Sequence, residues 1–144
     1  PVAHSFPTRR SSDLGAVLVA EAEREVRRLI SAFLKEQGYQ VLEAANGMEA
    51  EAVFRSHRNE IQCVLTDLTM PGKNGWETIE TLRRISPEIY IILSSGYDEA
   101  RVMAARYPEK PQAFLRKPYN LQDLLDAIQP SGIRPGRRPQ EARR

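Results

Sequence analysis

The sequence predicts an α/β fold in which a doubly wound, five-stranded parallel sheet lies between two layers of helices. Five short apolar runs of strand length alternate with segments whose apolar residues recur at helical spacing. Gly, Pro, Asn and Ser residues separate many of these segments, as expected at turns. Alternating strands and helices are typical of parallel sheets, whose right-handed crossovers place helices on both faces. We therefore expect a three-layer α/β/α arrangement.

The first two predicted strands enclose a helix. Residues 16–20 and 39–44 are the strands, because each is a short and largely apolar run. The helix between them is expected to end at Gly38, since glycine suits a helix C-terminus. Its predicted apolar face consists of Val26, Leu29, Ile30, Phe33 and Leu34.

The middle of the chain adds two helices around a third strand. Asn46 fits the N-cap of the first helix. The apolar face of that helix is expected to hold Met48, Ala52 and Val53. Residues 61–66 form the third strand, and a second helix runs from Gly75 to just before Pro87. The apolar side of this second helix comprises Ile79, Leu82 and Ile85.

The last third of the folded region supplies two strands and two helices. Residues 89–93 are the most apolar run, which predicts a central place in the sheet. Residues 98–106 are expected to form a short, weakly apolar helix, and residues 113–115 the fifth strand. The apolar face of the last helix is formed by Leu121, Leu124, Leu125 and Ile128.

Both ends of the chain differ from this pattern. Residues 4–14 read HSFPTRRSSDL and match, at every position, one reading frame of a widely used sequencing-library adapter. We therefore expect residues 1–14 to be an artefactual or disordered segment, with the natural amino terminus missing, and the domain to span residues 15–129. Residues 130–144 are rich in Pro, Gly and Arg without periodicity, which predicts a disordered basic tail.

Composition excludes several classes of protein. The net charge is +2, with +1 on residues 1–14 and +4 on residues 129–144, which leaves −3 on residues 15–128. An acidic folded region without a recognition helix argues against nucleic-acid binding. No run approaches the roughly 18 apolar residues of a membrane span, so we expect no membrane contact and a cytoplasmic location. Cys63 is the single cysteine and cannot form an internal disulfide.

Polar residues follow four of the predicted strands directly. They are Glu21, Asp67, Ser95 and Lys117. The carboxyl ends of parallel strands meet at one edge of a sheet, where ligands bind in α/β proteins. Two carboxylates suit Mg²⁺, and an ammonium group offsets charge on a phosphoryl group in transfer. The cluster therefore predicts that Asp67 is a nucleophile that accepts a phosphoryl group, with Ser95 bonding a phosphoryl oxygen.

Each residue of this cluster also has an ordinary structural interpretation. Asp67 could cap its loop, and Ser95 could be a turn residue. Glu21 could be a favourable charge at a helix N-terminus, and Lys117 a surface charge.

Four motifs resemble those of response-regulator receiver domains, which have a flavodoxin-like fold. They are VLVAEAE, VLTDLTMPGKNG, ILSSG and FLRKP, in that family's order and spacing across residues 16–128. The resemblance implies that Asp67 is the phosphoacceptor, Ser95 the switch hydroxyl and Lys117 the functional lysine. It also implies a Mg²⁺ ligand from the backbone carbonyl of Thr69. Phe114 takes the switch aromatic position, and the Lys117–Pro118 bond is expected to be cis.

One departure from the family concerns its first acidic loop. That loop normally carries two adjacent acids, whereas this chain has Glu21 followed by Ala22. Glu21 matches the acid that usually reaches the metal through water, and Ala22 replaces the direct ligand. We therefore expect weakened Mg²⁺ binding and slower phosphorylation. Glu23 is close in sequence, but the sequence does not show that it reaches the site.

The resemblance implies a regulatory phosphoacceptor rather than an enzyme. Its expected partner is a histidine kinase or a histidine phosphotransfer domain, and homodimer formation stays open. The Ser-Gly-Tyr sequence at 95–97, with no effector domain after residue 129, resembles the C-terminal receiver of a hybrid histidine kinase. A stand-alone regulator is the other architecture.

Two alternative functions remain open. The first is a degenerate receiver that acts as a phosphate-independent interaction module because of Ala22. The second is a phosphatase of the haloacid-dehalogenase type, but that family has an acid two residues after the nucleophile, where this chain has Thr69.

Overall fold

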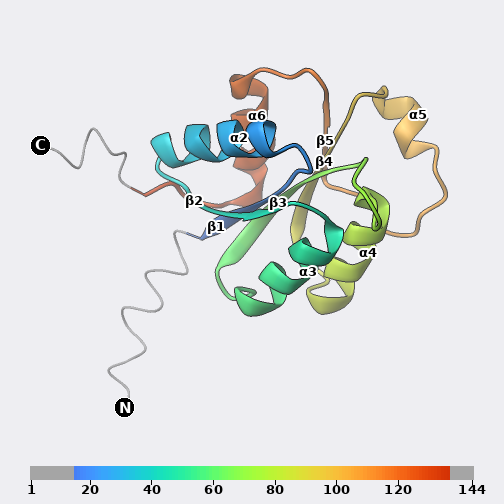
Figure 1. Ribbon diagram of the computed structural model, residues 1–144, viewed down its shortest axis with the longest axis horizontal. Coiled ribbons are helices and arrows are strands. Elements are labelled where there is room, and N and C mark those ends of the chain that lie inside the picture. Colours follow the sequence, from blue (N-terminus) through green and yellow to red (C-terminus); the bar gives the residue numbers. More distant parts are fainter. Residues whose placement is uncertain (1–14, 137–144) are drawn as a thin grey trace, which may run out of the picture.

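The computed structural model describes residues 15–136 (Figure 1). Residues 1–14 and 137–144, for which we expected an artefactual segment and a disordered tail, lie outside the described residues. The elements in chain order are β1 (Ala16–Ala20), α2 (Arg24–Glu36), β2 (Gln40–Ala44), α3 (Gly47–Ser56), β3 (Ile61–Asp67), α4 (Gly75–Ile85), β4 (Tyr90–Ser95), α5 (Glu99–Met103), β5 (Ala113–Arg116), α6 (Leu121–Ile128) and the 3-10 helix η2 (Gln129–Ser131).

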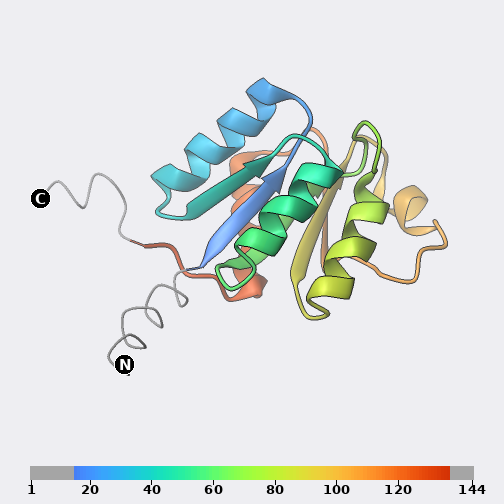
Figure 2. The same cartoon turned by 60° about the horizontal axis from the view of Figure 1, so that its bottom comes forward.

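The strands form one five-stranded parallel sheet with the order β2-β1-β3-β4-β5, which confirms the predicted doubly wound fold. α2 and α6 cover one face of the sheet, and α3 and α4 cover the other (Figures 1 and 2). The chain runs from β1 outward to β2 and then returns through β3 to β5. The strand order therefore reverses between β1 and β3, and the carboxyl ends of these strands flank the crevice where such folds bind ligands.

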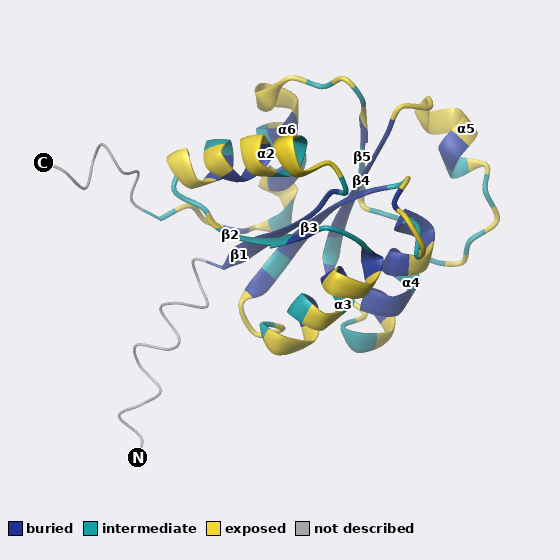
Figure 3. Cartoon of the chain, in the orientation of Figure 1, coloured by how far each residue is buried: buried dark blue, intermediate teal, exposed yellow. Residues whose placement is uncertain are grey.

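The core consists of two apolar clusters, one on each face of the sheet. Successive strand residues contribute to opposite clusters, as a strand period of two requires. Leu18 packs on the face covered by α3 and α4, and Val19 packs on the face covered by α2 and α6. Figure 3 shows that the inner strands are buried along most of their length. Burial on both faces explains why these strands read as continuous apolar runs.

Three details of the packing differ from the prediction. Leu29, expected on the apolar face of α2, has an exposed fraction of 65%. β3 is the middle strand, and β4 is an inner strand between β3 and β5. In α3 the predicted Met48 and Ala52 are exposed, Met48 to 72%, whereas the predicted Val53 does pack against the core. The fully buried residues of the helix are Gly47, Ala50 and Phe54. The face that carries Phe54 is buried in preference to the face that carries Met48, because burying the large Phe54 ring removes more apolar surface from water.

The predicted ends of two helices are confirmed. The Asn46 side chain accepts a hydrogen bond from the Glu49 N–H at 2.8 Å, so it caps α3. Gly38 follows the end of α2 with φ +98°, a left-handed conformation that favours glycine. No helix among residues 15–136 is both long enough and apolar enough to cross a bilayer.

The segment after α6 is ordered further than expected. η2 continues α6, and Ile133 packs into the cluster that contains Cys63 and Leu124. The Gly136 N–H then donates to the Gly38 carbonyl at 2.6 Å. The prediction of disorder from residue 130 therefore does not describe residues 130–136. A single apolar side chain in a polar segment has no periodicity, so the sequence pattern could not reveal this anchor.

Candidate functional site

The carboxyl ends of the strands bring Glu21, Asp67 and Lys117 together. The Lys117 Nζ lies 3.0 Å from Glu21 Oε1 and 3.3 Å from Asp67 Oδ2. Asp67 ends β3, and Lys117 follows β5 on the far side of β4. The Lys117 N–H donates to the Ser95 carbonyl at 2.8 Å, which aligns the lysine with the end of β4. The ammonium group thus bridges two largely buried carboxylates.

The close packing of these charges shifts their pKa values. Burial raises the pKa of Asp67, the negative charge of Glu21 raises it further, and Lys117 only partly opposes this. Burial favours the neutral form of Lys117, but the hydrogen bonds and charges of Glu21 and Asp67 outweigh it and raise the Lys117 pKa. A carboxylate with a raised pKa is more basic and therefore more nucleophilic.

The lysine loop also contains a cis bond and a half-buried phenol. The Lys117–Pro118 peptide bond is cis, as the resemblance implies. Tyr119 follows directly, and burial raises the pKa of its hydroxyl, with a further contribution from the charges of Glu21 and Asp67. The phenol therefore stays protonated beside the two carboxylates.

Ser95 lies at the same edge, but its hydroxyl does not contact Asp67. Its side chain is buried, and its Oγ accepts a hydrogen bond from the Tyr97 N–H at 3.0 Å. Its neighbour Ser94 is the residue paired with Asp67 across the sheet. The Ser95 hydroxyl therefore lies near the end of β3, and its oxygen accepts a hydrogen bond from its own loop.

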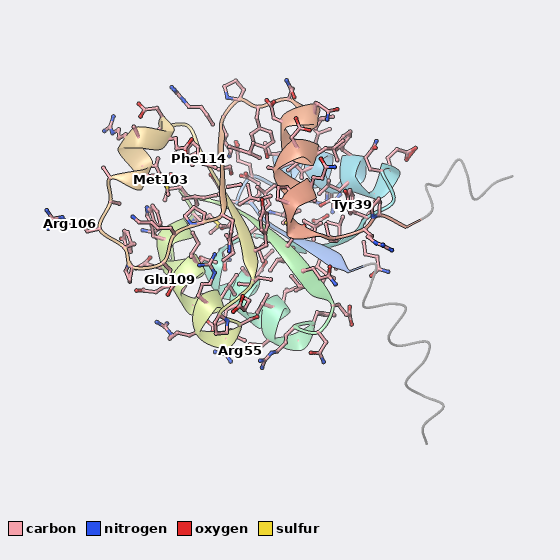
Figure 4. All side chains as sticks on the ribbon, turned by 180° about the vertical axis from the view of Figure 1, so that it is seen from behind. Tyr39, Arg55, Met103, Arg106, Glu109 and Phe114 are labelled. Carbon is pink, nitrogen blue, oxygen red and sulfur yellow. The ribbon has the colours of Figure 1, made fainter. Side chains whose placement is uncertain are left out.

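Phe114 lies on β5, opposite Leu93 of β4. It is half-buried and packs with Met103 of α5 against the cluster on the α3–α4 face (Figure 4). Leu93 belongs to the same cluster and precedes Ser95 by two residues, so Phe114 and Ser95 belong to the same face of the sheet.

The acidic loop offers fewer metal donors than the family pattern. The Glu21 Oε2 accepts from the Glu23 N–H at 3.1 Å, while its Oε1 contacts Lys117, so both oxygens are engaged. Ala22 is half-buried against the core, and its methyl side chain offers no atom to a metal. Glu23 is exposed and lines a groove beside Lys117. Residues 15–136 contain no cluster of three metal-binding His, Cys, Asp or Glu side chains.

The remaining donors are still of the type that Mg²⁺ prefers. Asp67 offers a carboxylate, and the exposed Thr69 follows it in the loop after β3 with a backbone carbonyl. This donor set fits a hard divalent cation but is one carboxylate short.

One residue that the sequence patterns did not single out is Arg27, in the first turn of α2. Its Nη1 donates to the Glu21 carbonyl at 2.8 Å, and its Nε contacts Glu43 Oε1 at 3.3 Å. An arginine one turn after an acidic loop is a signal that could have identified it, because the guanidinium can reach back to the loop.

Two grooves flank the cluster. One has a volume of about 460 Å³ and lies between α2 and the segment after β5. Its principal lining residues are Val26, Leu29, Ile30, Lys117, Tyr119 and Leu121. Leu29 is 65% exposed and Leu121 is 39% exposed, so apolar side chains form its rim.

The other groove has a volume of about 480 Å³ and lies between the acceptor loop and α5. Thr69 and Tyr97 line it, and so does Trp76, which stacks on Tyr107 with ring centroids 5.0 Å apart.

Comparison with known proteins identifies similar chains. A family model described as "Response regulator receiver domain" matches residues 17–129. Sensor kinase CckA of Brucella abortus is 32% identical over 117 residues, which cover 81% of this chain but only 12% of that kinase. Response regulator receiver protein CpdR of the same organism is 28% identical over 113 residues, covering 78% of this chain and 92% of CpdR.

Solved structures agree. A response regulator receiver domain protein from Clostridium thermocellum superposes with a TM-score of 0.76 at 29% identity, covering 82% of this chain and 94% of that one. The receiver domain of the hybrid histidine kinase CckA superposes with a TM-score of 0.68 at 27% identity, covering 81% and 98%.

Proposed function

Because the chain belongs to the family of response regulator receiver domains, we propose that Asp67 is the phosphoacceptor of a two-component phosphorelay. The observation that carries this proposal is the contact of 3.3 Å between Asp67 Oδ2 and Lys117 Nζ at the carboxyl edge of the sheet. The donor would be a phosphohistidine on a kinase or phosphotransfer protein. The domain would act as a regulatory phosphoacceptor and not as an enzyme.

The transfer follows from the charges around Asp67. Its carboxylate oxygen attacks phosphorus, the P–N bond to the donor imidazole breaks, and the imidazole leaves with that electron pair. Lys117, which already contacts Asp67, offsets charge on the phosphoryl oxygens. Glu21 holds the lysine in place through a side-chain contact of 3.0 Å. A bound Mg²⁺ would supply further neutralisation of the phosphoryl charge, with Asp67, Thr69 and Glu21 as the residues that hold it.

The response to phosphorylation would begin at Ser95. Its Oγ accepts a hydrogen bond from the Tyr97 N–H at 3.0 Å, so its hydroxyl proton is the group that it would donate to a phosphoryl oxygen on Asp67 as the 95–97 turn moves inward. Movement of the 95–97 turn opens space on the face where Phe114 packs beside Met103. The surface formed by α5, β5 and α6 would then change shape, which is a local charge event acting on a bistable element.

The apolar groove between α2 and the segment after β5 is the proposed docking site for the donor. Leu29 and Leu121 are exposed large hydrophobic side chains that line it, and so does Lys117, whose ammonium contacts Asp67. A donor helix with apolar residues beside its histidine could bury these leucines and bring phosphorus to Asp67. The receiver of a hybrid histidine kinase is the parent architecture that we propose.

A phosphate-independent interaction module is the second candidate function, and Ala22 favours it. The missing carboxylate lowers the negative charge available to a metal, and the Lys117 ammonium offsets one of the two negative charges that remain on Glu21 and Asp67. We expect weakened Mg²⁺ binding and slow, but measurable, phosphorylation.

Incubation with acetyl phosphate and Mg²⁺, followed by intact-mass measurement, separates the two candidates. We expect a gain of one phosphoryl group that disappears in Asp67→Asn. Asp126→Asn is the matched control, because Asp126 is an exposed carboxylate on α6 away from the cluster. A wild-type chain that gains no mass at any Mg²⁺ concentration would support the interaction module instead.

A further inference from the structure

We infer that Arg27 is a positioning residue, whose guanidinium fixes the backbone of Glu21 and Ala22 and thereby directs the Glu21 carboxylate to Lys117. This inference rests on the proposed function, because it concerns the same cluster. Arg27 touches neither Asp67 nor Lys117, so it would act through the acidic loop alone.

The contacts of Arg27 connect three segments. Its Nη1 donates to the Glu21 carbonyl at 2.8 Å and approaches the Ala22 carbonyl at 3.5 Å. Its Nε contacts Glu43 Oε1 of β2 at 3.3 Å, and the Arg27 side chain is 14% exposed. A charged donor that is largely shielded from water makes a stronger hydrogen bond than an exposed one.

Every other polar group of Glu21 is already engaged. Its N–H donates to the Ala44 carbonyl at 3.0 Å, and its carboxylate contacts Lys117 and the Glu23 N–H. The one remaining polar group of Glu21 is its backbone carbonyl, which accepts the hydrogen bond from Arg27. The loop carries one buried carboxylate with Ala22 beside it, and its other acid, Glu23, is exposed, so the backbone hydrogen bonds of the loop set where Glu21 points. Without the Arg27 hydrogen bond, the Glu21 carboxylate would shift, and Lys117, which is paired with it, would shift too.

A plainer reading is that Arg27 only ties α2 to β2 through Glu43. The two readings differ in a swapped variant, Arg27→Glu with Glu43→Arg. The swap keeps an ion pair between α2 and β2 but removes the donor to the Glu21 carbonyl. Arg27→Lys keeps the charge and one donor, so it serves as the conservative variant. Arg55→Met is the matched control, because it removes an exposed arginine that pairs with Glu51 on α3.

The test has one readout without metal or phosphate and one with them. In the metal-free protein, NMR records the Glu21 carboxylate carbon and the Lys117 side-chain nitrogen. In the second readout, which contains Mg²⁺, the rate of phosphorylation is measured at a series of acetyl phosphate concentrations. We expect Arg27→Met to shift both NMR signals and to lower the maximal rate about tenfold, since misplaced groups cost rate steeply. The donor concentration at half-maximal rate stays unchanged.

We expect Arg27→Lys to recover part of the rate, Arg55→Met to change nothing, and the swap to recover the melting temperature without the rate. Recovery of the rate and of both signals by the swap would overturn the inference, and so would unchanged signals in Arg27→Met. If the wild-type chain accepts no phosphoryl group, the proposed function fails, and the metal-free signals alone decide the role of Arg27.

Discussion

The two edges of the sheet are built in different ways. At the carboxyl edge, the Lys117 ammonium bridges the carboxylates of Glu21 and Asp67, and two grooves open beside them. At the amino edge, the segment after α6 packs against the domain, and Ile133 is buried in the cluster that contains Cys63. Charge that is costly to bury is concentrated where a ligand can approach, and apolar burial is concentrated where none is needed. We therefore expect changes at the carboxyl edge to affect function first, and changes at the amino edge to affect stability alone.

Removal of the lysine should produce the largest effect. We expect Lys117→Met to slow phosphorylation by acetyl phosphate by about a hundredfold or more, because an electrostatic contact to the transferring group is lost. It also leaves Glu21 buried without its cation, so the free energy of unfolding should fall, and Glu21→Gln in the same chain should restore part of it. Lys73→Met is the control, because that lysine pairs with Glu51 away from the cluster. Unchanged phosphorylation in Lys117→Met would remove the main support for Asp67 as acceptor.

At the amino edge, Ile133→Ala should lower the free energy of unfolding by about 2 kcal/mol, because the buried side chain leaves a cavity. Urea unfolding measures this, and the phosphorylation rate should not change.

Leu29→Ala is the paired variant at the carboxyl edge. The Leu29 side chain is 65% exposed, so the free energy of unfolding should change little. The variant should instead slow transfer from a phosphohistidine protein, while transfer from acetyl phosphate stays the same. A slower reaction of Ile133→Ala with acetyl phosphate would break the division between the edges.

Restoring the absent acid should have an intermediate effect. We expect Ala22→Asp to tighten Mg²⁺ binding about tenfold, as one added charge near a divalent ion contributes roughly 1.4 kcal/mol in a partly shielded site. The fluorescence of Trp76, which lines the groove beside Thr69, reports the titration. Ala52→Asp on the exposed side of α3 is the control. Submillimolar affinity in the wild-type chain would contradict the weakened site.

The smallest expected effect concerns Cys63. Burial raises the pKa of its thiol from 9.0 to about 12, with Ser131 partly opposing the shift. The unfolded chain therefore loses this proton at a lower pH than the folded chain does. The stability due to the protonated thiol is complete below pH 9 and is lost as pH rises toward 12. The free energy of unfolding should therefore be lower at pH 10 than at neutral pH by on the order of 1 kcal/mol from this group. Cys63→Ala should flatten this part of the pH dependence in urea unfolding, and an identical slope in both chains would refute the assignment.

The sequence alone predicted the sheet well, because alternating apolar runs and turn residues are local signals. It also brought Glu21, Asp67 and Lys117 to one edge, since residues that follow parallel strands must meet there. It could not predict the stripe of α3 that holds Phe54, because two stripes competed in a weakly amphipathic helix. It missed Arg27 and Ile133 because each acts through particular contacts, of Arg27 with the Glu21 carbonyl and of Ile133 with the core, that leave no periodic pattern. The engagement of Ser95 by the Tyr97 N–H likewise depends on turn geometry.

The hydrogen bond from Gly136 to Gly38 has a consequence for how this domain would work when joined to others. Gly15 precedes β1 and Gly136 lies beside the start of β2, so both points of attachment are at the amino edge of the sheet. A tether fastened there would leave the carboxyl edge, with Asp67 and Lys117, free to turn toward a donor. The length and stiffness of such a tether, and not any contact within the domain, would then set the effective concentration at which donor and acceptor meet.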